Sequence, residues 1–124
     1  MGKSMSETNS PISVSEQNNV QIVEFRDQRI LDEGNIAEIG QMLHGLIDAG
    51  EQPKILLDFA NVEHLSSAAL GMLINANTRL RKKNGQLRLV NIKPSIYEVF
   101  LITKLNKLFR VFPNRGEAMA SFTP

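Results

Sequence analysis

The chain has 124 residues and a formal net charge of +1 at pH 7, with 14 Lys and Arg against 13 Asp and Glu. This length is enough for one domain and too short for two, and so small a net charge gives no overall attraction to nucleic acid or to an anionic membrane. Because there is no cysteine, disulfides, thiolate metal sites and a thiol nucleophile are excluded. With neither a membrane-spanning apolar run nor a signal peptide in the sequence, we expect a cytoplasmic protein.

The N-terminal part predicts a tail followed by a hairpin. Residues 1–11 are polar and serine-rich, so we expect a flexible tail ahead of one domain over 12–124. Apolar and polar residues alternate over 12–15 and again over 20–25, which is typical of half-buried strands. Turn residues at 17–19 separate the two segments and complete the hairpin pattern.

A short extended piece at 29–31 and a helix over 36–49 are expected next. The helix is predicted from one apolar stripe at helical spacing, formed by Ile36, Ile39, Leu43, Leu46 and Ile47. Asn35 is the expected N-cap, with Glu38 at the capping-box position. Gly50 is well placed just past the end of the helix.

The rest of the chain predicts three strands that alternate with three helices. The strands are expected at 55–59, 87–92 and 108–112, and the helices at 67–83, from 94–95 onwards and from 114 to about 122. Ser95 with Glu98, and Asn114 with Glu117, carry capping signatures. Helical crossovers favour parallel strands with helices packed on the sheet. We therefore predict a single α/β domain, with a mixed central sheet of about four to five strands flanked by about four α-helices.

The segment 61–71 is the most informative part of the sequence, because it joins the buried strand to the second predicted helix. Functional loops of open α/β sheets gather at this edge. Ser66 is a natural N-cap, and Ser67 falls at or near the first helical position. Both serines can simply cap the helix, since capping serines are common. The same place also favours a phosphate, because free backbone N–H groups and the helix dipole attract an anion.

Enzymatic activity is not expected. Leu65 and Ala68 stand where a nucleophile elbow around Ser66 or Ser67 needs glycine. Neither of the two histidines, His44 and His64, has a carboxylate or a second histidine at a recognised metal spacing. We therefore expect neither a metal nor a cofactor.

The basic run Arg79, Arg81, Lys82 and Lys83 lies at the end of the second predicted helix. No aromatic residues interleave with it, whereas proteins that bind single strands add stacking rings to a charged groove. We interpret the run as a solvated helix end and expect no nucleic acid partner.

The stretch 56–71, which reads Leu-Leu-Asp-Phe-Ala-Asn-Val-Glu-His-Leu-Ser-Ser-Ala-Ala-Leu-Gly, resembles the signature of STAS domains. This family is named for sulfate transporters and anti-sigma factor antagonists. Residues 87–94 resemble its next strand and turn, and 99–109 resemble its third helix and final strand. The similarity covers about residues 12–122, and it implies the same mixed sheet flanked by helices.

The resemblance also implies a function. Soluble members of the family bind a serine-kinase anti-sigma factor and so free a sigma factor. The kinase phosphorylates a serine at the start of the second helix, which ends the binding, and a serine phosphatase restores it. The resemblance thus implies an anti-sigma factor antagonist that regulates transcription indirectly, with a kinase and a phosphatase as partners and at most a weak homodimer. The alternatives are a non-switching scaffold and an accessory subunit of a larger sensor or transport complex.

Laid on the family motif, Ser67 takes the position of the phosphorylated serine and Ser66 that of the aspartate before it. A neighbouring register makes Ser66 the acceptor, but Ser67 is preferred because Leu70 then aligns with the family's leucine. Ala69 replaces the family's glycine and adds a methyl group where a partner could approach. The residues expected to meet a partner are Asp58, His64, Ser66, Ser67, Ala68, Ala69 and Met72.

Overall fold

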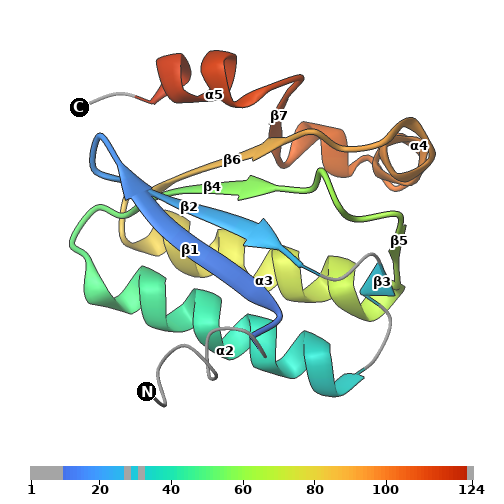
Figure 1. The fold of residues 1–124 in the computed structure, drawn as a ribbon, viewed down its shortest axis with the longest axis horizontal. Coiled ribbons are helices and arrows are strands. Elements are labelled where there is room, and N and C mark those ends of the chain that lie inside the picture. The colour runs from blue at the N-terminus through green and yellow to red at the C-terminus, as the bar shows by residue number, and fades with distance from the viewer. Residues whose placement is uncertain (1–9, 27–28, 31–32, 123–124) are drawn as a thin grey trace.

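The computed structural model describes residues 10–26, 29–30 and 33–122 (Figure 1). Its main sheet has five strands in the order β1-β2-β4-β6-β7. These are β1 (Ile12–Gln17), β2 (Val20–Phe25), β4 (Lys54–Asp58), β6 (Gln86–Val90) and β7 (Arg110–Phe112). The pair β1–β2 is antiparallel and the other neighbours are parallel. The predicted mixed α/β sheet is confirmed.

The opening hairpin turns on two asparagines. Asn18 and Asn19 have φ angles of 52° and 69°, and they connect the directly paired residues Gln17 and Val20. Positive φ at both central positions is the type I′ form of a two-residue hairpin loop, and asparagine tolerates this conformation better than most residues. The predicted hairpin is confirmed. Its hydrogen bonding extends to the last residue of the predicted tail, because the Arg26 amide donates to the Pro11 carbonyl oxygen over 2.9 Å.

Among the described residues, four α-helices flank the sheet, as predicted. They are α2 (Glu33–Ala49), α3 (Ser67–Lys82), α4 (Pro94–Ile102) and α5 (Arg115–Ser121), with a 3₁₀ turn, η1 (Leu105–Lys107), between α4 and β7. Helices α2 and α3 lie side by side on one face of the sheet, and α5 covers the opposite face (Figure 1). Two further short strands, β3 (Arg29–Ile30) and β5 (His64–Leu65), pair in parallel as a separate ribbon.

Two predicted helix caps are wrong. Helix α2 already begins at Glu33, so Asn35 lies inside its first turn and lacks the extended backbone that an N-cap needs. The apolar stripe that set the prediction begins only at Ile36, so it could not reveal a polar first turn. Helix α4 begins at Pro94 with Lys93 as its N-cap and no side-chain cap, because proline is preorganised for the first helical position. Ser95 is therefore inside the helix.

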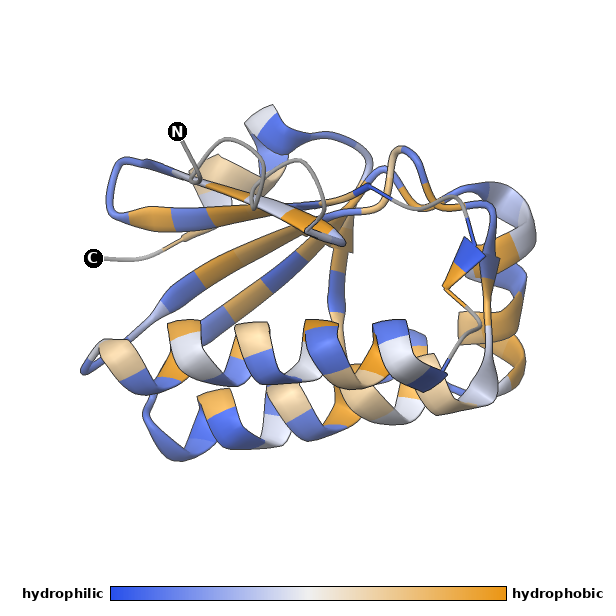
Figure 2. Cartoon of the chain, turned by 60° about the horizontal axis from the view of Figure 1, so that its bottom comes forward, coloured by the Kyte–Doolittle hydropathy of each residue, from blue (hydrophilic) through white to orange (hydrophobic). Residues whose placement is uncertain are grey.

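The central strand β4 is covered on both faces, as its apolar run predicts. Ile55 and Leu57 belong to the larger core, which packs against α2 and α3. Leu56 belongs to a smaller cluster that includes Ala118 of α5. Figure 2 shows the hydrophobic residues along the strands, which supply apolar side chains to these clusters. Within the described ranges, no helix is long and apolar enough to cross a membrane.

Candidate functional site

The site is the start of helix α3, which the short β3–β5 ribbon holds in place. After β4 the chain passes through β5, where Leu65 pairs with Ile30 of β3. The next residue, Ser66, donates its amide to the Ile30 carbonyl oxygen over 3.1 Å. The first turn of α3 is thus anchored to a strand that lies before α2 in the sequence.

Ser66 is the N-cap of α3. Its backbone is extended, with φ −88° and ψ 167°, and its Oγ accepts a hydrogen bond from the Ala69 amide over 3.1 Å. The Ser66 side chain is half-buried. The predicted cap is confirmed, and one lone pair of this hydroxyl oxygen is committed to the helix.

Ser67 is the first residue of α3, and its surroundings differ from those of Ser66. It is exposed, as is Ala68 beside it. Its hydroxyl makes no hydrogen bond to any residue that the structure describes. One of the two adjacent serines therefore holds the helix end, and the other presents an unengaged hydroxyl to solvent.

The remaining predicted site residues divide between surface and core. His64 is exposed on β5, as Ser67 and Ala68 are at the start of α3. Ala69 and Met72 are buried among the core residues under α3, so the Ala69 methyl group faces the interior. Asp58 is only 4% exposed and offers almost no surface to another molecule.

Asp58 instead joins three segments. Its Oδ1 accepts from the Ala60 amide over 2.9 Å and from Asn91 Nδ2 over 3.1 Å. Its Oδ2 accepts from Arg115 Nε over 2.7 Å, and Arg115 also pairs with Glu24 at 2.9 Å. No local pattern in the sequence groups these residues, although Asn91 directly follows a parallel strand, where loops converge. Asp58 therefore supports the loop that leads to Ser67.

A small groove lies beside the start of α3. It has a volume of about 270 Å³ and is lined by Glu63, His64, Leu65, Leu70, Ser95, Ile96 and Val99. Beyond Val99, helix α4 continues with exposed apolar residues, and Ile102 is 81% exposed. The sequence indicates this exposed apolar part of α4 by the run of apolar residues from Val99 to Ile102, because one helix face cannot bury four consecutive residues.

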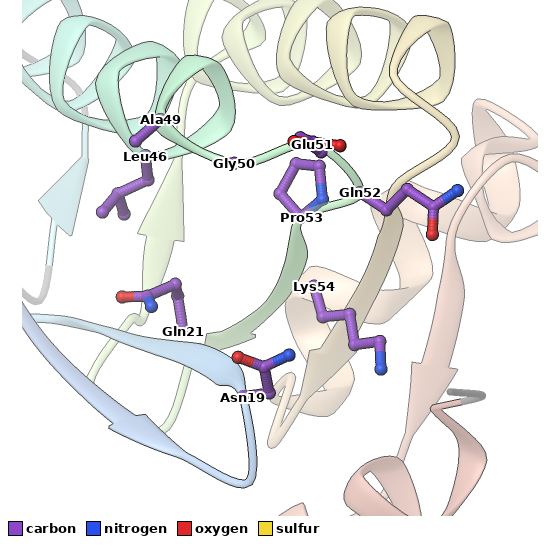
Figure 3. Close-up of a pocket in the computed structure, with 9 residues that line it drawn as sticks. All are labelled: Asn19, Gln21, Leu46, Ala49, Gly50, Glu51, Gln52, Pro53 and Lys54. Atoms are coloured by element: carbon purple, nitrogen blue, oxygen red, sulfur yellow. The ribbon is translucent and has the colours of Figure 1, made fainter.

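Another hollow, near the α2–β4 connection, lies away from this site. Figure 3 shows side chains from the β1–β2 hairpin, the end of α2 and the start of β4 around a hollow of about 600 Å³. Lys54, in its wall, begins β4, whereas Ser67 follows the opposite end of that strand. The size of a hollow therefore does not identify the candidate site at the start of α3. Among the described residues, no three His, Asp or Glu side chains gather as metal ligands.

Known proteins resemble this chain in sequence. The profile of the STAS domain family matches residues 11–118. A Bordetella bronchiseptica protein designated a candidate anti-sigma factor antagonist, BtrV, is 30% identical over 95 residues, which are 77% of this chain and 81% of that protein.

Solved structures show the same fold. An anti-sigma factor antagonist (STAS) domain protein from Planctomyces limnophilus matches with a TM-score of 0.79 at 20% identity, over 89% of this chain and 96% of that one. The phosphorylated form of SpoIIAA from Bacillus matches with a TM-score of 0.67 at 16% identity, over 88% of this chain and 96% of that one. From the profile match and the identity with BtrV, the chain belongs to the STAS domain family.

Proposed function

We propose that this chain is an anti-sigma factor antagonist that binds a serine-kinase anti-sigma factor and is released when that kinase phosphorylates Ser67. The observation that carries the proposal is the exposed, unengaged hydroxyl of Ser67 at the first position of α3. A kinase must bring this oxygen to the γ-phosphate of ATP, so the hydroxyl has to lie on the surface and be free to turn.

Ser67 is a better acceptor than Ser66 on physical grounds. The Ser66 oxygen accepts from the Ala69 amide, and moving it into a kinase active site breaks the cap of α3. Loss of a serine cap costs about 1 kcal/mol of helix stability. Ser67 can be modified without that loss.

A phosphate on Ser67 suits the domain itself. It adds about −1.5 to −2 charge and three acceptor oxygens, and the N-terminus of a helix favours negative charge. Helix α3 has no acidic residue in its first turn to repel it. The phosphate therefore weakens the complex rather than the domain, because it must lose its hydration water where it meets the partner. A serine phosphatase that removes the group restores binding.

The relatives support the same function. BtrV is designated a candidate anti-sigma factor antagonist, and SpoIIAA, an anti-sigma factor antagonist, has been solved in a phosphorylated form. We extend the contact surface from Ser67 to its exposed neighbours His64 and Ala68.

The test is to incubate the purified chain with the serine-kinase anti-sigma factors of its host and ATP, and to locate the phosphate by mass spectrometry. We expect phosphate on Ser67 in the unaltered chain and in Ser66→Ala, and none in Ser67→Ala. In calorimetry, Ser67→Ala should bind the kinase as the unaltered chain does. Ser67→Glu should bind more than a hundredfold more weakly, which corresponds to about 3 kcal/mol.

The paired variants separate the switch from its alternatives. Ser66→Ala removes the cap without touching the proposed acceptor, so it should bind normally. Phosphate found only on Ser66, or equal affinities of Ser67→Ala and Ser67→Glu for the kinase, would refute the switch. A chain that binds no kinase and instead forms large assemblies in light scattering favours the scaffold.

A further inference from the structure

The outer edge of strand β1 has no partner strand within the described ranges. β1 stands at one end of the strand order of the main sheet and pairs there only with β2 (Figure 1). A sheet edge of this kind presents a row of backbone N–H and C=O groups that can pair with another chain. The edge of β1 is therefore a binding surface made by the backbone itself.

The hydrogen bonding of the hairpin determines which backbone groups point outward. The Arg26 amide donates to the Pro11 carbonyl oxygen, so these two residues form a hydrogen-bonded pair. Hydrogen-bonded and non-hydrogen-bonded pairs alternate along an antiparallel ladder, and the register is unbroken along β1. The backbone N–H and C=O groups of Ile12, Val14 and Glu16 therefore point away from β2.

The outward groups of Val14 and Glu16 are open, whereas those of Ile12 are engaged locally. The backbone of Val14 and Glu16 makes no hydrogen bond outside the hairpin to any residue that the structure describes. At Ile12, the Ser10 hydroxyl donates to the carbonyl oxygen over 2.8 Å and accepts from the amide over 3.4 Å. The second of these bonds is long, so an incoming strand can replace it.

The two edges of the main sheet are protected to different degrees. The opposite edge strand, β7, has only three residues and carries Arg110, and short or charged edge strands discourage pairing with another chain. β1 has six residues, contains no Lys, Arg or Pro, and has no bulge in its register. Its one charged residue, Glu16, lies near its end. β1 thus lacks most of the features that keep an edge strand unpaired.

The backbone of β1 is complementary to a second copy of itself. In an antiparallel pairing with a two-fold axis at Val14, this residue lies opposite its own copy, and Ile12 lies opposite Glu16 of the second copy. All three outward-facing residues then occupy hydrogen-bonded positions, in which paired residues exchange N–H···O bonds. The two copies of Glu16 lie about 14 Å apart along the strands, so no like charges face each other.

The side chains of β1 suit the same pairing. Ile12 belongs to the core that packs against α2 and α3, and Val14 lies on the same face of the sheet because side chains alternate along a strand. Val14 is 40% exposed, and the pairing places it against its own copy. On the other face, Ser13 lies opposite Ser15 of the second copy, and cross-strand hydroxyl pairs can hydrogen-bond. The pairing therefore buries an exposed valine on one face and joins hydroxyl groups on the other.

We infer that two copies of this chain associate through β1 about a two-fold axis at Val14, so that their five-stranded sheets join into one continuous sheet. The contact is confined to one strand and its flanks, and interfaces of that size belong to weak, transient complexes. The association is therefore a concentration-dependent monomer–dimer equilibrium. The pairing makes no use of Ser67, so it can be present or absent whether or not the proposed switch operates.

The experiment is sedimentation equilibrium of the full chain up to millimolar concentration, combined with a charge exchange at position 14. Val14→Lys and Val14→Glu each place like charges opposite each other across the axis, which destabilises a strand pair. Each variant alone should raise the dissociation constant of the dimer at least tenfold. A mixture of the two places opposite charges across the axis and should form a dimer of one copy of each, within threefold of the original affinity. A mixture that associates no better than either variant alone would refute the axis at Val14.

Val99→Lys is the matched control, because Val99 is also 40% exposed but lies on α4. It should leave the dissociation constant within twofold, and circular dichroism checks that each variant is folded. A dimer that is disrupted by Val99→Lys and not by Val14→Lys would assign the association to the exposed apolar face of α4 and overturn the inference. A chain that stays monomeric up to millimolar concentration would overturn it as well.

Amide hydrogen exchange provides a readout in the unaltered chain. The Val14 amide points outward and should exchange with solvent more slowly as the protein concentration rises. The Ser15 amide, which faces β2, should not change and serves as the reference. A Val14 amide that is equally protected at every concentration would show that the N-terminal residues of the same chain cover the edge, and the inference would be wrong.

Discussion

Arg115 Nε donates to Asp58 Oδ2 over 2.7 Å, although 57 residues separate them in the sequence. Asp58 is the last residue of the central strand β4 and Arg115 the first residue of α5. The bond fixes the start of α5 on the face of the sheet opposite α2 and α3. It also makes Asp58 a structural residue under the loop that carries Ser67.

Replacing Arg115 with Met should lower the free energy of unfolding by about 1.5 to 3 kcal/mol, the usual contribution of a hydrogen bond to a charged group. The Asp58 carboxylate stays buried while losing its only cationic partner among the described residues. Urea unfolding followed by circular dichroism measures the change. Arg81→Met is the control, since this exposed cation forms no ion pair within the described ranges and should shift stability by less than about 0.5 kcal/mol. Equal losses in both variants would contradict the role of Asp58.

Ser66→Ala should destabilise the domain by about 1 kcal/mol, because the Ala69 amide loses its cap. Ser67→Ala should change stability by less than about 0.5 kcal/mol, since the Ser67 hydroxyl is exposed. Thermal unfolding of the two variants side by side measures both values. If Ser67→Ala is the more destabilised, the assignment of cap and free hydroxyl is reversed.

The sequence predicted the features that depend on neighbouring residues. The alternation of apolar and polar residues predicted the hairpin, and an apolar stripe at helical spacing predicted α3. The order of strands and helices along the chain then predicted the mixed sheet. The cap at Ser66 could be predicted because serine just before a helix is itself a common N-cap. The caps at Asn35 and Ser95 were wrong, because polar residues just ahead of an apolar stripe can belong to the helix itself.

Features that depend on distant contacts could not be predicted. Asp58 was expected to meet a partner, but its environment is set by Asn91 and Arg115, which the fold brings from other segments. Only the register of β6 and β7 places Arg88 beside Arg110, and no local pattern in either strand indicates that pairing.

Lys83 should contribute to stability by capping the neighbouring helix. Its Nζ donates to the carbonyl oxygens of Ile47 and Asp48, each over 3.1 Å, and α2 has no basic residue of its own in its last turn. Lys83→Met should lower the free energy of unfolding by about 1 kcal/mol. Lys82→Met removes the neighbouring exposed cation and should have little effect in the same urea titration. A larger loss in Lys82→Met than in Lys83→Met would exclude the capping role.

The ion pair between Asp48 and Arg79 should stabilise the α2–α3 contact in a pH-dependent way. Two hydrogen bonds, of 3.1 and 2.9 Å, join the side chains, and the bond from Arg79 lowers the pKa of Asp48. A pKa that is lower in the folded state contributes stability above the unfolded value of about 3.9, and the contribution is lost as pH falls through the folded value. Asp48→Asn should therefore reduce Tm at pH 7 and have less effect below about pH 4. Glu38→Gln, at an exposed position of the same helix, is the control, and a pH-independent loss in Asp48→Asn would rule the pair out.

Two glycines should respond to the same substitution with opposite signs. A Cβ at Gly85 would lie 2.6 Å from the Pro53 carbonyl oxygen and 2.8 Å from the Leu80 side chain, whereas one at Gly71 would have nothing within 4 Å. Gly85→Ala forces the turn away from the segment before β4 and should cost about 1 to 3 kcal/mol. Gly71 lies within α3, where alanine is favoured over glycine by about 0.5 to 1 kcal/mol. Denaturant unfolding of the two variants should show a loss for Gly85→Ala and a gain for Gly71→Ala. If both variants gain stability or both lose it, the close approach of Gly85 to Pro53 and Leu80 does not determine the effect of Gly85→Ala.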